Sequence, residues 1–449
     1  MRDFLPADVR KRDYVIGIIK EVYESYGFEP LETPAVENIE TLMGKYGDEG
    51  NQLIFKILKR GEKLDSSLER IASTTSKTST TSSTGQLADL ALRYDLTVPL
   101  ARIVANNKNE LPKFFKCYQI QPVWRADRPA RGRFREFYQC DVDAIGSNSM
   151  VVEAEILTAV SEILRRLGFK DFTIRLNHRQ VLTDILDTAG VPEELHSDAL
   201  IAIDKLDKIG AEGVATELDE RGISETASAM LMEIFAKTQE ILNQEKDINR
   251  TIVGNLINIV SNEVLTELGQ ILKFADKAPI LIDPSLARGL SYYTGAIMEI
   301  NVPDLAGSLG GGGRYDGLIG MFGKEQIPAC GFSLGLERIL VVMEEKDMFP
   351  PEIAASNSAD ILVTIWNEET IGESLKLASE LRNQGLRVVV YPEADKLGKQ
   401  FKYADSIDIP YVCIQGDEEL REGKVKLKNM RTGDESKLAS NAIADKICS

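Results

Sequence analysis

The chain is poor in the residues that most often carry metal-dependent or nucleophilic chemistry. It has two histidines, His178 and His196, and five cysteines that are spread without Cys-x-x-Cys spacing. Zinc sites need closely spaced ligands, and serine or cysteine nucleophiles usually need a histidine base. These absences argue against both kinds of site. They favour reduced, mostly buried thiols at Cys117, Cys140, Cys330, Cys413 and Cys448.

Long apolar runs are also missing. No stretch approaches the roughly 20 apolar residues of a membrane-spanning helix, and the start from Met1 to Pro6 has no apolar signal region. We therefore expect a cytoplasmic protein with no membrane partner. The net charge of −17 argues against a protein that coats nucleic acid indiscriminately. Local basic patches could still bind one particular nucleic acid, and weak general affinity suits an enzyme that must release its product.

The length of 449 residues exceeds what a single hydrophobic core usually serves, so we expect about two to four domains. Helical periodicity from Asp8 to Tyr26 stops at Gly27, and an extended stretch reaches Pro34. The segment from Ser73 to Thr84 is almost wholly Ser and Thr. It cannot bury a core and predicts a mobile loop, with phosphorylation or glycan attachment as the alternative.

Apolar spacing divides the rest of the chain. Two β-rich runs predict an antiparallel hairpin, and helical periodicity then predicts an insertion made of helices. After Pro350 and a polar run, strands alternate with helices, which predicts a small α/β domain with its own core. The hairpin runs are 114–125 and 133–145, the helical segment is 177–276, further strands are expected at 279–282, 292–302 and 312–319, and a helix at 335–345.

Arginines crowd the predicted hairpin. Such crowding is unfavourable unless anions approach, and guanidinium groups match phosphate oxygens in a bidentate way. Phosphate binding is one interpretation. The alternative is a hairpin whose arginines pair with its own acidic residues, Asp127, Glu136, Asp141 and Asp143. The arginines are Arg125, Arg128, Arg131, Arg133 and Arg135.

Strand alternation places mixed polar groups on shared sheet faces. One face would carry Arg93, Asp95 and Thr97, where an anionic and a hydroxyl side chain could bind an ammonium group. A second face would combine cation, aromatic, amide and carboxylate groups, a mixture that a buried face does not contain without a ligand. Its members are Arg133, Arg135, Phe137, Gln139, Asp141 and Asp143.

Three later clusters add charge, aromatic groups and glycine. Arg288 precedes the pair Tyr292 and Tyr293. The run 310–313 places four glycines ahead of a predicted strand, where backbone could approach a ligand closely, although a glycine run alone is more often a loop. It is no P-loop, because the Gly-Lys-Ser/Thr ending is missing. Arg338 lies in the first turns of an amphipathic helix, where an isolated arginine more often forms a surface ion pair.

Together these segments resemble the motifs of class II aminoacyl-tRNA synthetases, and specifically those of the histidyl-tRNA synthetase family, over nearly the whole chain. Pro34 with its preceding helix is similar to the first class II motif, which builds the dimer interface in that family. The hairpin end at 132–141 resembles the second motif, and 335–338 the third. The segments around Arg288 and at 312–316 are similar to the two motifs peculiar to the histidine enzymes.

The resemblance implies an α+β fold in which an antiparallel sheet of about six or seven strands is flanked by helices. A helical insertion would interrupt this catalytic domain, and an α/β anticodon-binding domain would follow it. The expected ranges are 1–176 and 277–347 for the catalytic domain, 177–276 for the insertion, 348–359 for a linker and 360–449 for the anticodon-binding domain.

The implied activity is that of a histidine–tRNA ligase. ATP would activate L-histidine to histidyl-adenylate with release of pyrophosphate, and histidine would then pass to the 3′ end of its tRNA with release of AMP. Mg²⁺ would bridge phosphates of the nucleotide. The expected partners are a histidine-accepting tRNA, L-histidine, ATP and a second copy of the chain, with no DNA. The alternative is a catalytically silent relative with a regulatory or tRNA-sensing role; regulatory relatives typically lack the C-terminal domain and the histidine-specific motifs, which are both present here.

Site roles also follow from the resemblance. Asp95 and Thr97 would bind the histidine α-amino group, and Tyr292 and Tyr293 would shape the imidazole pocket. Arg125 and Arg288 would act at the α-phosphate as the catalytic candidates, close enough to contact histidine as well. One departure is Ser291, where the family usually has aspartate. The remaining candidates are Gln139 and Asp143 for histidine, Arg133 and Arg338 for the other phosphates, and Phe134 and Phe137 for adenine.

Overall fold

The computed structural model describes residues 1–73, 87–242, 247–288, 292–303, 305, 307–354 and 359–448. They form two compact units, Met1–Met348 and Phe349–Ser449. Within the Ser/Thr-rich segment, Ser73 ends helix α4 (Glu62–Ser73), and the remainder lies outside the described residues. Ser291 also lies outside them.

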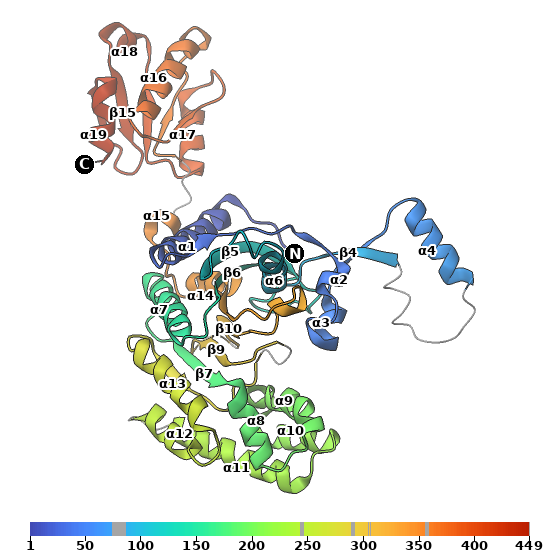
Figure 1. The fold of residues 1–449 in the computed structure, drawn as a ribbon. Coiled ribbons are helices and arrows are strands. Elements are labelled where there is room, and N and C mark those ends of the chain that lie inside the picture. Colours follow the sequence, from blue (N-terminus) through green and yellow to red (C-terminus); the bar gives the residue numbers. More distant parts are fainter. Residues whose placement is uncertain are drawn as a thin grey trace. The chain divides into compact units, whose positions relative to one another are not determined.

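An eight-stranded sheet forms the middle of the first unit (Figure 1). Its order is β1-β5-β6-β11-β10-β9-β7-β8, and neighbours from β5 to β7 are antiparallel. The expected α+β class and antiparallel sheet are confirmed for the six strands from β5 to β7. The sheet has eight strands where six or seven were expected, because short β1 and β8 add a parallel strand at each edge. The bounds are β1 Glu29–Pro30, β5 Phe115–Trp124, β6 Glu136–Ile145, β11 Ala329–Gly335, β10 Gly310–Arg314, β9 Ala296–Asn301, β7 Thr173–His178 and β8 Ile280–Ile282.

Helices α1 (Pro6–Ser25), α7 (Val151–Arg166) and α14 (Leu336–Glu345) pack together against β6 and β11. Helix α1 begins at Pro6, whose fixed φ suits a first turn, and the chain leaves it at Gly27 with φ of +76°. Helix α6 (Thr97–Asn106) shares a core with Phe115 and Cys117 of β5. Beside α6 lie a three-stranded sheet and two short helices: β2 Val36–Asn38, β4 Ala88–Leu92, β3 Lys56–Leu58, α2 Ile39–Leu42 and α3 Gly47–Leu53.

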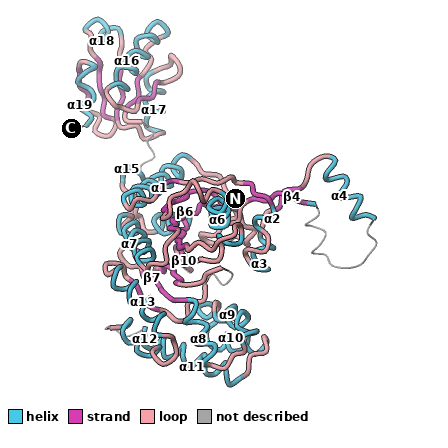
Figure 2. Tube along the Cα trace, in the orientation of Figure 1, coloured by secondary structure: helices cyan, strands magenta, loops and turns pink. Residues whose placement is uncertain are grey.

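The helical insertion lies between β7 and β8 in the sequence. Figure 2 shows its helices, α8 to α13, grouped together next to β7. Its helices pack in sequence order, and the last, α13, returns to pack on α7 and β7. Gly210 breaks α10 with a φ of 70°, which glycine adopts at little cost. The bounds are α8 Arg179–Thr188, α9 His196–Ile203, α10 Leu206–Glu220, α11 Glu225–Leu242, α12 Ile248–Leu256 and α13 Asn262–Phe274.

The second unit is a five-stranded sheet in the order β13-β12-β14-β15-β16, with helices on both faces. The first three strands are parallel, as strand–helix alternation predicts, while the antiparallel pair β15 and β16 was not anticipated. A short helix, α15 (Pro351–Ala354), occupies part of the expected linker. The other bounds are β12 Ile361–Val363, α16 Ile371–Asn383, β13 Val388–Val390, α17 Leu397–Ser406, β14 Tyr411–Ile414, α18 Asp417–Glu422, β15 Val425–Asn429, β16 Glu435–Leu438 and α19 Ile443–Cys448.

The cysteines and His178 have structural positions in the fold. Cys117, Cys140, Cys330 and Cys413 are buried free thiols. His178 caps α8, and burial lowers its pKa to about 4. Within the described ranges, no helix has both the length and the apolar character needed to cross a bilayer.

Candidate functional site

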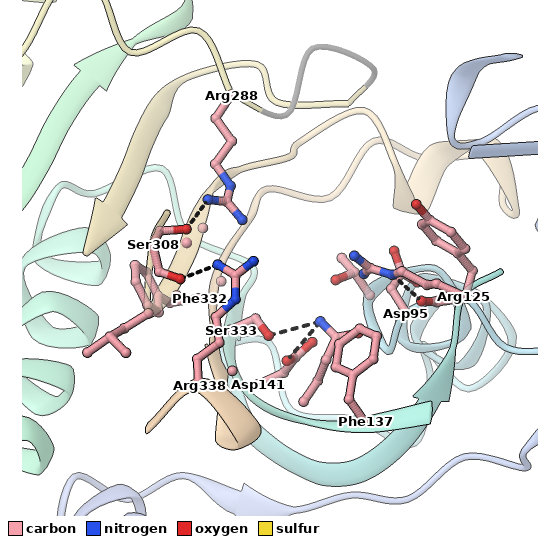
Figure 3. Close-up of a pocket in the computed structure, with 18 of the residues that line it drawn as sticks. Asp95, Arg125, Phe137, Asp141, Arg288, Ser308, Phe332, Ser333 and Arg338 are labelled. Atoms are coloured by element: carbon pink, nitrogen blue, oxygen red, sulfur yellow. Dashed lines mark hydrogen bonds between the residues drawn. The ribbon is translucent and has the colours of Figure 1, made fainter. Parts of the chain in front are cut away.

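A cavity of about 410 Å³ opens on the face of the large sheet that also packs against α6 (Figure 3). Its volume is within the range of small-ligand sites. Strands β6, β10 and β11, the start of α6 and the start of α14 supply its wall. Every residue to which the family resemblance gives a site role lines it, so the fold brings these residues together. They are Asp95, Thr97, Arg125, Arg133, Phe134, Phe137, Gln139, Asp143, Arg288, Tyr292, Tyr293 and Arg338.

Strand β6 supplies the polar floor. Gln139, Asp141 and Asp143 alternate along it and lie opposite Gly335, Ser333 and Gly331 of β11. A Cβ at Gly331 would stand 1.8 Å from Asp143 Oδ1, so glycine there makes room for the carboxylate.

Two buried acceptors on this floor have no partner among the described residues, namely Gln139 Oε1 and Asp143 Oδ2. Their other atoms are fixed, because Gln139 Nε2 donates to Ser333 Oγ at 2.9 Å and Tyr315 Oη donates to Asp143 Oδ1 at 2.6 Å. Leaving a buried acceptor unpaired costs about 1–3 kcal/mol. A site built this way favours a ligand that brings N–H donors.

Carboxyl groups crowd this end of the cavity. Burial first, and nearby Asp95 to a lesser extent, raise the pKa of Asp143 to about 7, although the hydrogen bond from Tyr315 acts to lower it. Burial and then the neighbouring Asp143 raise the pKa of Asp141 as well. A cationic group placed among these carboxyls would relieve their mutual repulsion.

Asp95 lies at the N-terminus of α6, and not on a strand. Strand β4 ends at Leu92 and Thr97 opens the helix, so the predicted shared strand face is wrong. Arg93 turns away from the cavity and donates to the backbone oxygens of Thr33 and Pro122. Asp95 Oδ1 accepts from Val98 N at 3.1 Å and from Tyr46 Oη at 2.9 Å.

Aromatic side chains line the cavity beside these carboxyls. Tyr292 and Tyr293 meet edge to face with 4.8 Å between ring centroids, and Tyr292 meets Tyr315 in the same manner at 6.4 Å. Tyr46 packs against Tyr94 at 4.6 Å. Such a wall fits a flat, polar-edged ring.

Arg288 and Arg338 lie together at the opposite end, whereas Arg125 lies beside Asp95 (Figure 3). Arg288 Nη1 donates to Ser308 Oγ at 2.7 Å, and Arg338 Nη1 donates to the backbone oxygen of Ser308. Arg125 lies between the rings of Tyr94 and Phe137, with its Nε on Tyr94 O. Burial lowers the pKa of Arg338, and nearby Arg288 and Arg133 lower it further. This end therefore attracts an anion.

The five hairpin arginines differ in their surroundings, and Arg128 is exposed outside the cavity wall. Arg125 and Arg133 line the cavity. Arg131 instead donates to Glu345 of α14, and Arg135 to the backbone oxygen of Asp127. Strand β6 begins only at Glu136, so Arg133 and Arg135 precede it and the predicted common face with Gln139 is wrong for them.

The glycine run forms strand β10 itself, and so the expectation that it precedes a strand is wrong. A Cβ at Gly311 would lie 2.7 Å from Arg288 Cζ, and one at Gly313 would lie 3.0 Å from the Tyr293 ring. Bare backbone here lets two functional side chains lie flat on the strand.

Gly312 offers a test of this packing. A Cβ there would stand 2.1 Å from the backbone oxygen of Gly331 and 2.7 Å from Phe332 Cα. We expect Gly312→Ala to lower the free energy of unfolding by about 1–3 kcal/mol, as overpacking does. Gly254→Ala in α12, where no atom lies within 4 Å, is the matched control. Equal urea midpoints for the two variants would contradict the tight fit of β10.

Several lining residues escaped sequence reasoning. Tyr46, Ser308 and Tyr315 were given no role from the sequence, although Tyr315 lies within the segment 312–316, and tertiary packing brings all three to the cavity. Glu337, the neighbour of Arg338, was also given no role from the sequence. Its carboxylate accepts from Tyr138 N, and burial raises its pKa to about 7.

Known proteins resemble this chain along its whole length. The family model for histidyl-tRNA synthetase matches residues 61–339, and that for an anticodon binding domain matches 360–449. The chain is 41% identical to a histidine–tRNA ligase of Christiangramia forsetii, covering 99% of this chain and 97% of the relative. It is 43% identical to that of Porphyromonas gingivalis, covering 98% and 96%. The crystal structure of histidyl-tRNA synthetase from Nostoc sp. PCC 7120 has a TM-score of 0.77 at 30% identity, over 100% of this chain and 97% of that one.

Proposed function

This chain belongs to the histidyl-tRNA synthetase family, and from that premise we propose how its cavity divides between histidine and ATP. The enzyme is an aminoacyl-tRNA synthetase that ligates histidine to tRNA. One observation carries the division: unpartnered buried acceptors and crowded carboxyls lie at one end of the cavity, Arg288 and Arg338 lie together at the other, and Arg125 lies beside Asp95 (Figure 3).

Histidine binds at the carboxyl end. Its α-ammonium group meets Asp95 and Thr97, and its imidazole lies against Tyr292 and Tyr293. A neutral imidazole has one N–H donor and one acceptor nitrogen. The unpartnered oxygen of Asp143 accepts from that N–H, and Gln139 takes a second donor of the substrate.

The phosphates of ATP bind at the end of Arg288 and Arg338 (Figure 3). Arg125 and Arg288 approach the α-phosphate, and Arg133 and Arg338 meet the other phosphates. The adenine lies beside Phe134 and Phe137. The described residues contain no cluster of three or more His, Cys, Asp or Glu that could bind a metal. Mg²⁺ therefore enters with the nucleotide, which is its usual mode, and Asp127 and Glu337 are the carboxylates of this end that could share it.

The chemistry needs position and charge more than acid–base groups. The carboxylate of histidine is already ionised, so it attacks the α-phosphorus without a base, and pyrophosphate leaves. Arginine donors stabilise the charge that grows on the phosphate oxygens. A hydroxyl of the terminal ribose of tRNA then attacks the acyl carbon of the adenylate, and AMP leaves.

The remaining partners follow from the same family. The unit Phe349–Ser449 reads the anticodon of a histidine-accepting tRNA, and α1 with Pro34 contributes to a homodimer. The enzyme acts in the cytoplasm.

A truncated chain tests this division of labour. Residues 1–348 contain the whole cavity, so they should support histidine-dependent exchange of pyrophosphate into ATP. Charging of tRNA should fall much further, by at least about tenfold more, because each lost 1.4 kcal/mol of tRNA binding is a factor of ten. Circular dichroism and gel filtration check that the piece is folded. Equal losses of pyrophosphate exchange and tRNA charging in a folded piece would contradict the division of labour. If the full chain exchanged pyrophosphate into ATP at the same rate without histidine, histidine would not be the substrate.

A further inference from the structure

Arg288 lines the cavity and is held there by two hydrogen bonds from one of its nitrogen atoms. Its Nη1 donates both to Glu299 of β9 and to Ser308 Oγ (Figure 3 shows the second bond). The guanidinium lies over Gly311, which is the register partner of Glu299. Since Nη1 makes both bonds, the other edge of the planar group remains to meet phosphate oxygens.

Glu299 is within reach of a second cation. It is also the register partner of Arg175 on β7, and its Oε1 lies 3.8 Å from Arg175 Nη1. Arg175 is already engaged by two closer carboxylates. Its Nε is 2.6 Å from Asp283 Oδ2, and its Nη1 is 2.6 Å from Asp207 Oδ2. The Arg175 side chain is only 10% exposed and Asp283 is 3% exposed, whereas Asp207 is 57% exposed, so solvent screens the bond to Asp207 more than the bond to Asp283.

Asp207 belongs to α10 of the helical insertion, whereas Arg175, Asp283 and Glu299 belong to the sheet or its edge. A line of alternating charges therefore runs from the insertion to the cavity. Without Asp207, Arg175 Nη1 would turn to Glu299, the next nearest carboxylate. Two arginines would then compete for one carboxylate, and Arg288 would lose part of its anchor.

We propose that Glu299 is a positioning residue for Arg288, and that Asp207 of the insertion keeps Glu299 available by engaging Arg175. The proposal rests on the proposed function, in which Arg288 meets the α-phosphate. A shift of about 1 Å at such a group can slow a reaction by about 100-fold, because the charge no longer meets the transition state. The insertion thereby influences the activation step without touching either substrate.

Glu299→Gln tests the first half of the proposal. It keeps the side-chain length and removes the charge. We expect kcat of histidine-dependent pyrophosphate exchange to fall about 10- to 100-fold, with KM for ATP and histidine changed less than about threefold. A structural role would instead lower the melting temperature and the fraction of active enzyme. Ser308→Ala, which removes the second bond to Nη1, is the companion variant if Glu299→Gln fails to fold, and it should lower kcat in the same selective way.

Asp207→Asn tests the link to the insertion. We expect kcat to fall about 3- to 10-fold in the wild-type background and to change little further in the Glu299→Gln background, since coupled residues are not additive. Asp198→Asn is the matched control, because Asp198 is also an exposed carboxylate of the insertion paired with an arginine, Arg221, at 2.8 Å. It should leave kcat unchanged.

The outcomes separate this proposal from the proposed function. If Arg288→Ala slows exchange and a folded Glu299→Gln keeps the wild-type kcat, the positioning role is wrong and the proposed function stands. If Arg288→Ala itself leaves exchange intact, the assignment of Arg288 fails first. If Asp207→Asn and Asp198→Asn behave alike, or if the two effects of Asp207→Asn and Glu299→Gln simply add, the insertion has no part in placing Arg288.

Discussion

Arg288→Ala is expected to slow histidine-dependent exchange of pyrophosphate into ATP by about 10²–10³-fold, the usual loss for one transition-state donor. Arg288 is anchored through Nη1 to Ser308 and Glu299, so its remaining donors have a fixed direction. Negative charge on the α-phosphate oxygens grows as the carboxylate of histidine attacks. A fixed cation therefore stabilises the transition state more than the bound substrates, and kcat should fall while KM for histidine changes much less.

Steady-state exchange over a range of histidine and ATP concentrations separates these constants. Arg221→Ala is a fitting control, because its guanidinium is likewise engaged by carboxylates, Glu217 and Asp198, but lies in the insertion outside the cavity wall. Its kcat should match the wild type. A rate for Arg288→Ala within about threefold of the wild type would remove Arg288 from the α-phosphate and leave that contact to Arg125.

For residues within one strand, the sequence predicted which side chains lie on the same face. Gln139, Asp141 and Asp143 alternate on β6, and a two-residue period fixes their common face wherever that strand lies. The same argument failed for Arg93, Asp95 and Thr97. Every second side chain lies on the same face only while the chain remains a strand. Strand β4 ends at Leu92, and helix α6 begins at Thr97.

Contacts between distant segments were not predictable. Nothing in the sequence distinguishes one hairpin arginine from another. It does not show that Arg131 pairs with Glu345 of α14 while Arg125 reaches the cavity. Tyr315 donates to Asp143 across 172 positions. Such pairs depend on the register of β10, β11 and β6, which only the folded sheet defines.

The glycine run shows how one pattern supports two structures. Four glycines predict a flexible loop by composition, since glycine weakens strands. In the sheet they form β10, because neighbouring groups lie where each Cβ would be, including the Gly331 oxygen at Gly312 and Arg288 at Gly311. The reason for the glycines therefore lies in residues that are far away in the sequence.

Asp143→Ala is expected to raise KM for histidine by about 10²-fold or more, while KM for ATP changes little. The Asp143 carboxylate is 2% exposed, and its Oδ2 has no partner in the described part of the chain. A site built around a polar group discriminates strongly, because a mismatched ligand leaves buried partners unpaired. The alanine variant loses the acceptor for the imidazole N–H and also leaves the Tyr315 hydroxyl without its acceptor.

The second effect can be separated from the first with Tyr315→Phe. That variant keeps the carboxylate and removes only the donor to Oδ1, so it should raise KM for histidine far less than Asp143→Ala does. Isothermal titration with histidine alone then gives binding without chemistry. If Asp143→Ala left both this affinity and KM unchanged, the carboxylate would serve mainly as the acceptor for Tyr315. The imidazole would then have to be recognised by Gln139, whose Oε1 is the other unpartnered acceptor on the same strand.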